Sequence, residues 1–231
     1  MASFDVNGIK LRVPGHCLTP PLKRALESGT YEGSERAALE RHLRPDDTVL
    51  DIGAGAGYLS ILASRVVGGE NVVSVEASPV MMDVLRANLN SNGAREAALV
   101  HGAVVGDSHD GDTIDFLVRD AFWASSIAPE DGSAGREKMR SVPALKLSSL
   151  LEIYKPSIVT LDVEGGEVEL CQQPWPDHVR LVIMEIHTKI YGPATIQKIF
   201  DGMSRTGMTI MPFGTRGEVI TLQRVYPGED A

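Results

Sequence analysis

The chain has 231 residues, of which 43% are hydrophobic and 23% are charged, and its formal net charge is −9. These proportions are ordinary for a globular protein and argue against a chain that is disordered throughout. Because the acidic chain contains no run of Lys or Arg, it disfavours a module that holds nucleic acid or an anionic membrane through a basic face.

Cysteine usage and the N-terminus indicate a cytoplasmic protein. Cys17 and Cys171 form no C-x-x-C pair, which excludes zinc-knuckle and thioredoxin motifs. The first residues lack the basic and apolar regions of a signal peptide, and no apolar run is long enough to span a bilayer. We therefore expect reduced cysteines and no membrane association.

The N-terminal segment predicts a β-hairpin followed by a helix. Asn7-Gly8 separates two short alternating runs, residues 4–6 and 9–13, which is a strong hairpin signal. Residues 34–43 predict a helix with Ser34 as a candidate N-cap. We regard the hairpin as a candidate interface of a homodimer.

From residue 48 onward, apolar runs that suit strands alternate with helical patterns. Expected strands cover residues 48–52, 72–76, 97–105, 114–118, 157–163, 179–186, 208–211 and 218–224. Expected helices cover residues 58–67, 78–90, 145–153, 166–172 and 194–205. Such a rhythm predicts an α/β fold with a mostly parallel sheet and helices on both faces. The sequence thus predicts one main domain, residues 34–226, after a lead-in segment, residues 1–33.

Residues 119–143 break this rhythm and are expected to form a long loop. We interpret the loop as a substrate lid. Its aromatic residues, Phe122 and Trp123, then either stack on a flat or sugar-like acceptor or pack the lid onto the sheet.

A glycine-rich turn is the most distinctive local motif. Gly53, Gly55 and Gly57 lie between an expected strand and an expected helix, where glycines let a ligand approach the backbone closely. The dinucleotide motif is G-x-G-x-x-G, but here the third glycine comes one residue early and Tyr58 follows it. Asp51, just before the turn, would repel a pyrophosphate and attract a cationic ligand such as a sulfonium.

Glu76 supplies a second acid, at the end of the next expected strand. A carboxylate there can accept hydrogen bonds from both hydroxyls of a ribose. Together with Asp51 and the turn, it indicates S-adenosylmethionine as the cofactor. The simpler alternative is a strand–turn–helix unit whose acids only cap backbone amides.

Two later strands also become acidic where they end. Asp162 and Glu164 lie on one face of the first, and Glu185 and His187 share a face of the second, because side chains alternate along a strand. The carboxyl edge of a parallel sheet is where ligands bind. Structural alternatives exist, because Glu164 and Glu167 suit a helix N-terminus and a Glu–His pair can be a structural hydrogen bond.

These motifs resemble the FkbM family, a branch of the class I S-adenosylmethionine-dependent methyltransferases. The resemblance extends from about residue 29 to residue 224, and its most specific motif is Leu-Asp-Val-Glu-Gly-Gly-Glu. The matching segments are residues 29–32, 51–57, 75–79, 88–93 and 161–167. At Gly55 the family usually has Asn, so the turn is nearer to the general class I form.

The resemblance implies a Rossmann-like class I methyltransferase fold, with a seven-stranded sheet that has one antiparallel strand near its edge. It also implies which residues hold the cofactor: the methionine end near Tyr31, Glu32, Asp51 and Gly53, the ribose at Glu76, and the adenine between Ala103 and Val104. Asp162 would lie beside the methyl donor. The complete expected cofactor set adds Gly55, Gly57, Tyr58 and Ala77.

The resemblance implies O-methylation of a small-molecule hydroxyl, such as that of a sugar or another natural product. An alcohol must lose its proton before it attacks, so the site needs a base or a metal. Either Asp162 or His187 is the base, or Asp162, Glu185 and His187 bind a divalent cation such as magnesium. Methylation of RNA or protein and a non-catalytic cofactor-binding role are the alternatives.

Overall fold

The computed structural model describes residues 1–118, 126–127, 139–226 and 228. It begins with the expected hairpin, in which β1 (Ala2–Val6) pairs antiparallel with β2 (Ile9–Val13). Asn7 and Gly8 connect the strands with φ values of 53° and 78°, as a two-residue hairpin turn requires. Along the described part of the chain, no helix combines the length and apolar character needed to cross a membrane.

The main sheet has seven strands in the order β12-β13-β11-β10-β3-β4-β5. Only β13 runs antiparallel to its neighbours, which confirms the expected mostly parallel sheet with one reversed strand near the edge. The strands are β3 (Val49–Ile52), β4 (Val72–Glu76), β5 (Ala98–His101), β10 (Ile158–Leu161), β11 (Leu181–Glu185), β12 (Met208–Ile210) and β13 (Val219–Arg224).

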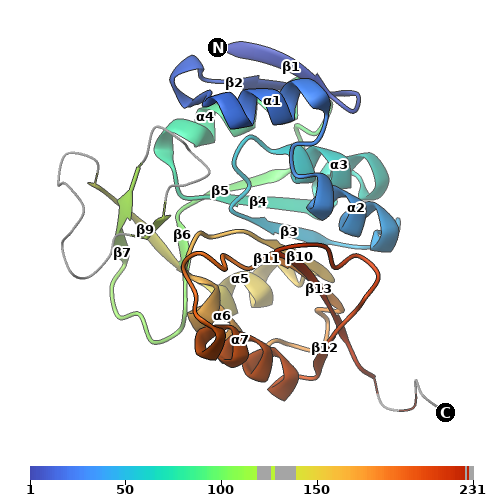
Figure 1. Cartoon of the computed structure of the whole chain (residues 1–231), viewed down its shortest axis with the longest axis vertical. Helices are drawn as coiled ribbons and strands as arrows, with labels where there is room; N and C mark the ends of the chain where they lie inside the picture. Colours follow the sequence, from blue (N-terminus) through green and yellow to red (C-terminus); the bar gives the residue numbers. More distant parts are fainter. Residues whose placement is uncertain (119–125, 128–138, 227, 229–231) are drawn as a thin grey trace.

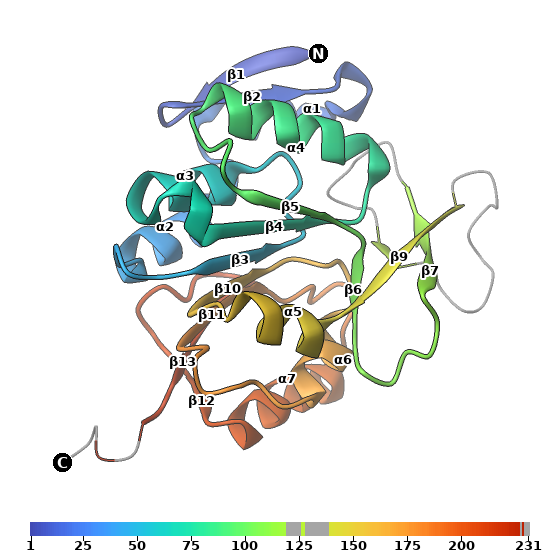
Figure 2. The same ribbon diagram turned by 180° about the vertical axis from the view of Figure 1, so that it is seen from behind.

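Helices cover both faces of this sheet (Figures 1 and 2). One face carries α2 (Gly33–His42), α3 (Tyr58–Val67) and α4 (Pro79–Ser91), and the hairpin and α1 (Pro20–Ser28) pack outside these helices. Two short 3-10 helices, η1 (Gly15–Cys17) and η2 (Gly69–Asn71), precede α1 and β4. The other carries α5 (Leu147–Tyr154), α6 (Glu167–Gln172) and α7 (Pro193–Arg205). Successive residues of β3 feed the two cores alternately, Val49 into the first and Leu50 into the second.

The third expected strand is wrong as a single element, because Gly102 breaks it. Gly102 has a φ of 156°, and a Cβ there would lie 2.7 Å from Leu145 and from the Pro143 carbonyl oxygen. The chain leaves the main sheet at this residue and enters a second sheet, so residues 114–118 also lie outside the main sheet. The second sheet has the order β6-β9-β7-β8, with β6 (Ala103–Val105), β7 (Thr113–Leu117), β8 (Ser126–Ile127) and β9 (Met139–Lys146).

Two further expectations concern particular residues. Ser34 is not the N-cap of its helix: α2 begins at Gly33, and Glu32 occupies the cap with a φ of 47°. Ser78 does precede α4, with Pro79 in the first turn, as expected. The expected loop over residues 119–143 is wrong at residues 126–127 and 139–143, which belong to β8 and β9, because these segments pair with β7. Phe122 and Trp123 lie outside the described residues, so the lid stays a prediction.

Candidate active site

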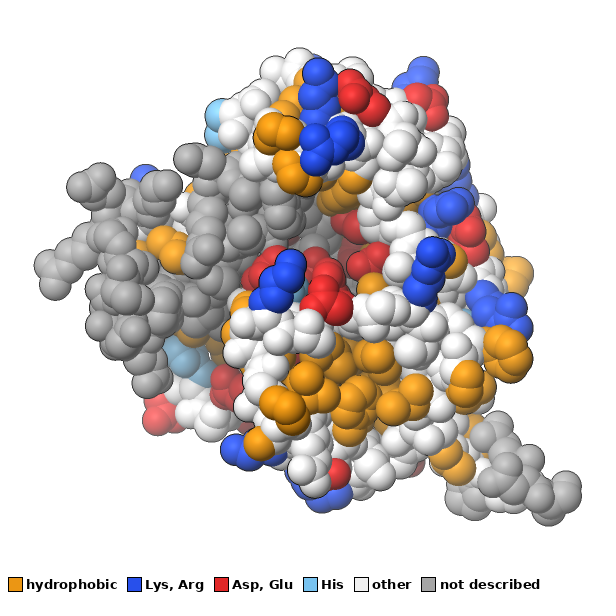
Figure 3. All heavy atoms as spheres, viewed as in Figure 1, with side chains coloured by type: hydrophobic (Ala, Val, Ile, Leu, Met, Phe, Trp, Pro, Cys, Tyr) orange, Lys and Arg blue, Asp and Glu red, His pale blue; other side chains and the backbone are white. Residues whose placement is uncertain are grey.

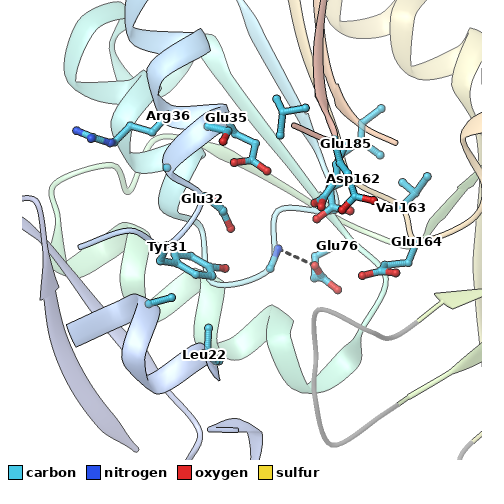
Figure 4. Close-up of a pocket in the computed structure, with 18 of the residues that line it drawn as sticks. Leu22, Tyr31, Glu32, Glu35, Arg36, Glu76, Asp162, Val163, Glu164 and Glu185 are labelled. Carbon is cyan, nitrogen blue, oxygen red and sulfur yellow. Dashed lines mark hydrogen bonds between the residues drawn. The ribbon is translucent and has the colours of Figure 1, made fainter. Parts of the chain in front are cut away.

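A cavity of about 780 Å³ lies where β3, β4, β10 and β11 end, the edge at which α/β sheets bind ligands. Figure 3 shows a hollow in which acidic side chains gather, and Figure 4 shows several of these side chains facing a common space. The expected site residues that line it are Tyr31, Glu32, Gly53, Gly55, Glu76, Ala77, Ala103, Val104, Asp162 and Glu185. The expected residues that do not line it are Asp51, Gly57, Tyr58 and His187.

Gly53 lies between the part of the cavity at the ends of β3 and β4 and the acidic part at the ends of β10 and β11. Its φ is 85°, and a Cβ built on it would lie 1.8 Å from the carbonyl oxygen of Asp162. Its N–H donates to the Val75 carbonyl oxygen at 3.0 Å. The glycine therefore allows the β3 turn to pack directly against the end of β10, which brings the expected cofactor residues beside Asp162.

The Glu76 carboxylate is held by the backbone around it. Its Oε2 accepts a hydrogen bond from the Gly55 N–H at 2.8 Å (Figure 4), and its Oε1 accepts one from the Ser78 N–H at 2.6 Å. Burial raises the pKa of Glu76, although these amides oppose the shift. Because each carboxylate oxygen can accept more than one hydrogen bond, both remain able to receive a ribose hydroxyl.

Asp51 and Tyr58 lie beneath the turn rather than in the cavity wall. The Asp51 carboxylate accepts hydrogen bonds from Ser60 Oγ at 2.5 Å and Thr160 Oγ1 at 2.6 Å. Tyr58 is fully buried, and its ring meets that of Tyr31 edge to face with 5.8 Å between centroids. Both residues support the wall, and their direct contact with a cofactor stays a prediction.

Carboxylates outnumber cations in the other half of the cavity. Beside Asp162 and Glu185, the wall contains Glu164 and two acids that the sequence motifs did not single out, Glu35 of α2 and Glu218 before β13. Arg36 and Arg216 also border the cavity, and the Arg36 side chain points away from these acids in Figure 4. The unexpected acids come from elements distant in sequence, so only the tertiary structure brings them together.

Crowding of these acids affects their protonation. Burial, followed by the charge of Glu185, raises the pKa of Asp162 well above its usual range. Burial and the nearby Glu35 raise the pKa of Glu185, and burial raises that of Glu32. A cation entering this half of the cavity would reverse these shifts, because an opposite charge favours the ionised carboxylate.

His187 lies behind the wall, between three carboxylates. Its Nδ1 is 2.8 Å from Glu167 Oε1, and its Nε2 is 3.4 Å from both Asp162 Oδ1 and Glu164 Oε2. Burial alone would lower the pKa of His187, but these acids raise it to about 11. The surrounding carboxylates therefore favour the protonated form of the ring.

The structure brings together a different set of candidate metal ligands from the expected one. Within the described residues, Asp162, Glu167 and His187 each offer one ligand atom, and these atoms lie within 4.8 Å of one another. The expected set contained Glu185 in place of Glu167. Both ring nitrogens of His187 face carboxylates, so the same three residues also form an ion-pair network. The metal stays a prediction.

Comparison with known proteins identifies relatives of one part of the chain. Residues 34–120 match the family model of ribosomal protein L11 methyltransferases. The enzyme of that name from Thermus thermophilus is 39% identical over 88 residues, which are 34% of this chain and 34% of the relative. The chain thus matches about a third of that relative's length. Residues 34–120, which match the family model, contain the glycine turn and Glu76.

Two solved structures are similar over most of the chain. One is a precorrin-6y C5,15-methyltransferase from Geobacter metallireducens, with 17% identity, a TM-score of 0.48 and 93% of each chain covered. The other is a ribosomal protein L11 methylase from Lactobacillus delbrueckii subsp. bulgaricus, with 16% identity, a TM-score of 0.48, and 85% of this chain and 80% of that chain covered.

The strand order and the glycine turn with its acids are those of the Rossmann-like class I methyltransferase fold, and residues 34–120 match the model of a methyltransferase family. The fold assignment rests on the chain's own sheet, in which the antiparallel β13 separates β12 from the parallel strands. The matched family differs from the FkbM branch, and the resemblance to that branch stays a prediction.

Proposed function

We propose that the protein transfers a methyl group from S-adenosylmethionine to an amino group of a polypeptide. In this proposal Glu76 binds the ribose, and Ala77, Ala103 and Val104 contact the adenine. The methionine part passes Gly53 and Gly55, which directs the methyl group toward Asp162.

The acidic half of the cavity is the observation that carries this proposal. Glu35, Asp162, Glu164 and Glu185 line one wall, and Arg36 is turned away from them. Such a wall attracts a cationic amine and repels an anionic acceptor. The names of the matched relatives, which are ribosomal protein methyltransferases, favour an acceptor that belongs to a protein.

The chemistry requires a neutral amine. A protonated amine entering the cavity donates to a carboxylate, and Asp162 with its raised pKa suits the role of proton acceptor because general bases work best near the operating pH. The nitrogen lone pair then forms a bond to the methyl carbon while the carbon–sulfur bond breaks. S-adenosylhomocysteine leaves, and the proton stays on the carboxylate.

A hydroxyl of a small molecule is the second candidate acceptor. The ion pair between His187 and the carboxylates of Asp162 and Glu164 favours it, because an ionised carboxylate can remove a hydroxyl proton. The FkbM resemblance points the same way. In this alternative the same cofactor residues act, and only the acceptor differs.

Methyl transfer from labelled S-adenosylmethionine distinguishes the two acceptors. Parallel reactions contain a lysine-rich peptide, its acetylated form, and a panel of sugars and phenols. We expect label on the unmodified peptide only, and Glu185→Gln should raise the KM for that peptide about tenfold by removing one wall charge. The control Glu27→Gln removes an exposed acid of α1 and should change nothing. Label on the hydroxyl panel alone would replace the amine proposal with the second candidate.

A further inference from the structure

We propose that Glu167 is a positioning residue, which acts through His187 to hold the cavity carboxylates of Asp162 and Glu164. The inference rests on the proposed methyl transfer for its effect on turnover, but its geometry is independent of the acceptor. Glu167 itself does not line the cavity.

Glu167 is a buried acid whose carboxylate accepts three hydrogen bonds. It is the first residue of α6 and has no exposed surface. Its carboxylate accepts hydrogen bonds from His187 Nδ1 at 2.8 Å, from the Gly165 N–H at 3.1 Å and from the Tyr191 hydroxyl. Burial opposes ionisation, but the His187 and Tyr191 donors keep the pKa of Glu167 below its usual value.

His187 connects Glu167 to the acids of the cavity. With Nδ1 fixed by Glu167, the opposite nitrogen faces Asp162 Oδ1 and Glu164 Oε2, each 3.4 Å away. Both of these carboxylates line the cavity, whereas His187 does not. The order of contacts is therefore Tyr191, Glu167, His187 and then the two acids, and only the last pair can meet a ligand.

The backbone of this segment is also specialised. Glu164 has a φ of 49°, a left-handed conformation that is unfavourable for residues with a Cβ. Such conformations persist where surrounding contacts hold them. The His187 ring supplies such a contact for Glu164, so the Glu167–His187 pair helps to hold the direction of this cavity acid.

Two readouts test this role in the intact 231-residue chain. In turnover of the lysine-rich peptide, Glu167→Gln should lower kcat about tenfold or more and leave the KM and the Kd for S-adenosylmethionine within about threefold, as removal of a supporting hydrogen-bond partner does elsewhere. The matched control is Glu169→Gln, two residues along the same helix, whose carboxylate accepts from Ser108 instead. It should retain wild-type kcat.

The second readout is the protonation of His187, observed in ¹⁵N-histidine spectra and assigned with His187→Gln. The charged groups facing the ring are Asp162, Glu164 and Glu167, with Glu185 and Glu218 further away. In the wild type both ring nitrogens should stay protonated from about pH 6 to 8. In Glu167→Gln the ring should begin to titrate within that range.

If Glu167→Gln fails to fold, Tyr191→Phe is used in its place. It removes one donor to Glu167 and leaves the acid in place, so a smaller fall in kcat, about two- to fivefold, is expected. A His187 ring that titrates normally in the wild type, or wild-type kcat in Glu167→Gln, would overturn the positioning role. If the wild type does not methylate the peptide, the acceptor proposal fails, while the histidine spectra still decide the role of Glu167.

Discussion

The Glu76→Gln substitution tests the cofactor assignment most informatively, because it changes one acceptor atom. Glu76 receives two backbone N–H groups, from Gly55 and Ser78, and the amide can accept from only one of them. A hydrogen bond to a charged group contributes about 1.5–3 kcal/mol. Since each 1.4 kcal/mol is a factor of about ten in affinity, loss of one such bond to the ribose should weaken cofactor binding about 10- to 150-fold.

The assay is calorimetric titration with S-adenosylmethionine, accompanied by urea unfolding of the protein without cofactor. The unsatisfied backbone amide should lower the free energy of unfolding by about 1–3 kcal/mol. Asp83→Asn, an exposed acid of α4 outside the cavity, is the matched control and should alter neither quantity. A Glu76→Gln variant that binds the cofactor within about threefold of wild type would refute the proposed ribose contact.

Three further predictions concern the turn, Asp162 and metals. Gly53→Ala should lower the free energy of unfolding in urea by more than about 2 kcal/mol, because its Cβ would collide with the Asp162 carbonyl oxygen. The control is Gly93→Ala, which also has a positive φ but open space around the Cβ, and it should lower this free energy by only about 1 kcal/mol. Because the pKa of Asp162 is raised in the folded state, the free energy of unfolding should fall as pH rises above about 4. Asp162→Asn should weaken this pH dependence, and identical pH profiles of unfolding for the wild type and the variant would contradict it. Chelation should leave peptide methylation unchanged, and recovery of lost activity by magnesium would restore the metal hypothesis.

The sequence predicted the elements with strong local signals. Asn7-Gly8 predicted the hairpin turn, and the patterns around residues 58–67 and 72–76 agree with α3 and β4. These features depend on neighbours in the chain, such as turn residues and the period of apolar positions. The sheet edge could also be predicted, because parallel strands bring their carboxyl ends together.

Features that depend on distant contacts could not be predicted in the same way. The break at Gly102 follows from its packing against β9, which lies some forty residues later in the chain. Glu167 suited a helix N-terminus by sequence, and only its contacts with His187 and Tyr191 show another role. Asp51 occupies the expected strand end, yet hydroxyls of α3 and β10 hold its carboxylate beneath the turn.

The central claim is that this cavity binds S-adenosylmethionine as the methyl donor. Calorimetry of the intact 231-residue chain with S-adenosylmethionine and S-adenosylhomocysteine, with NAD as the control, tests it most directly. We predict micromolar binding of both sulfur-containing ligands and no binding of NAD, because Glu76 and the Gly53–Gly55 turn suit an unphosphorylated ribose beside a cation. Binding of NAD alone would contradict the account and remove the basis for the proposed methyl transfer.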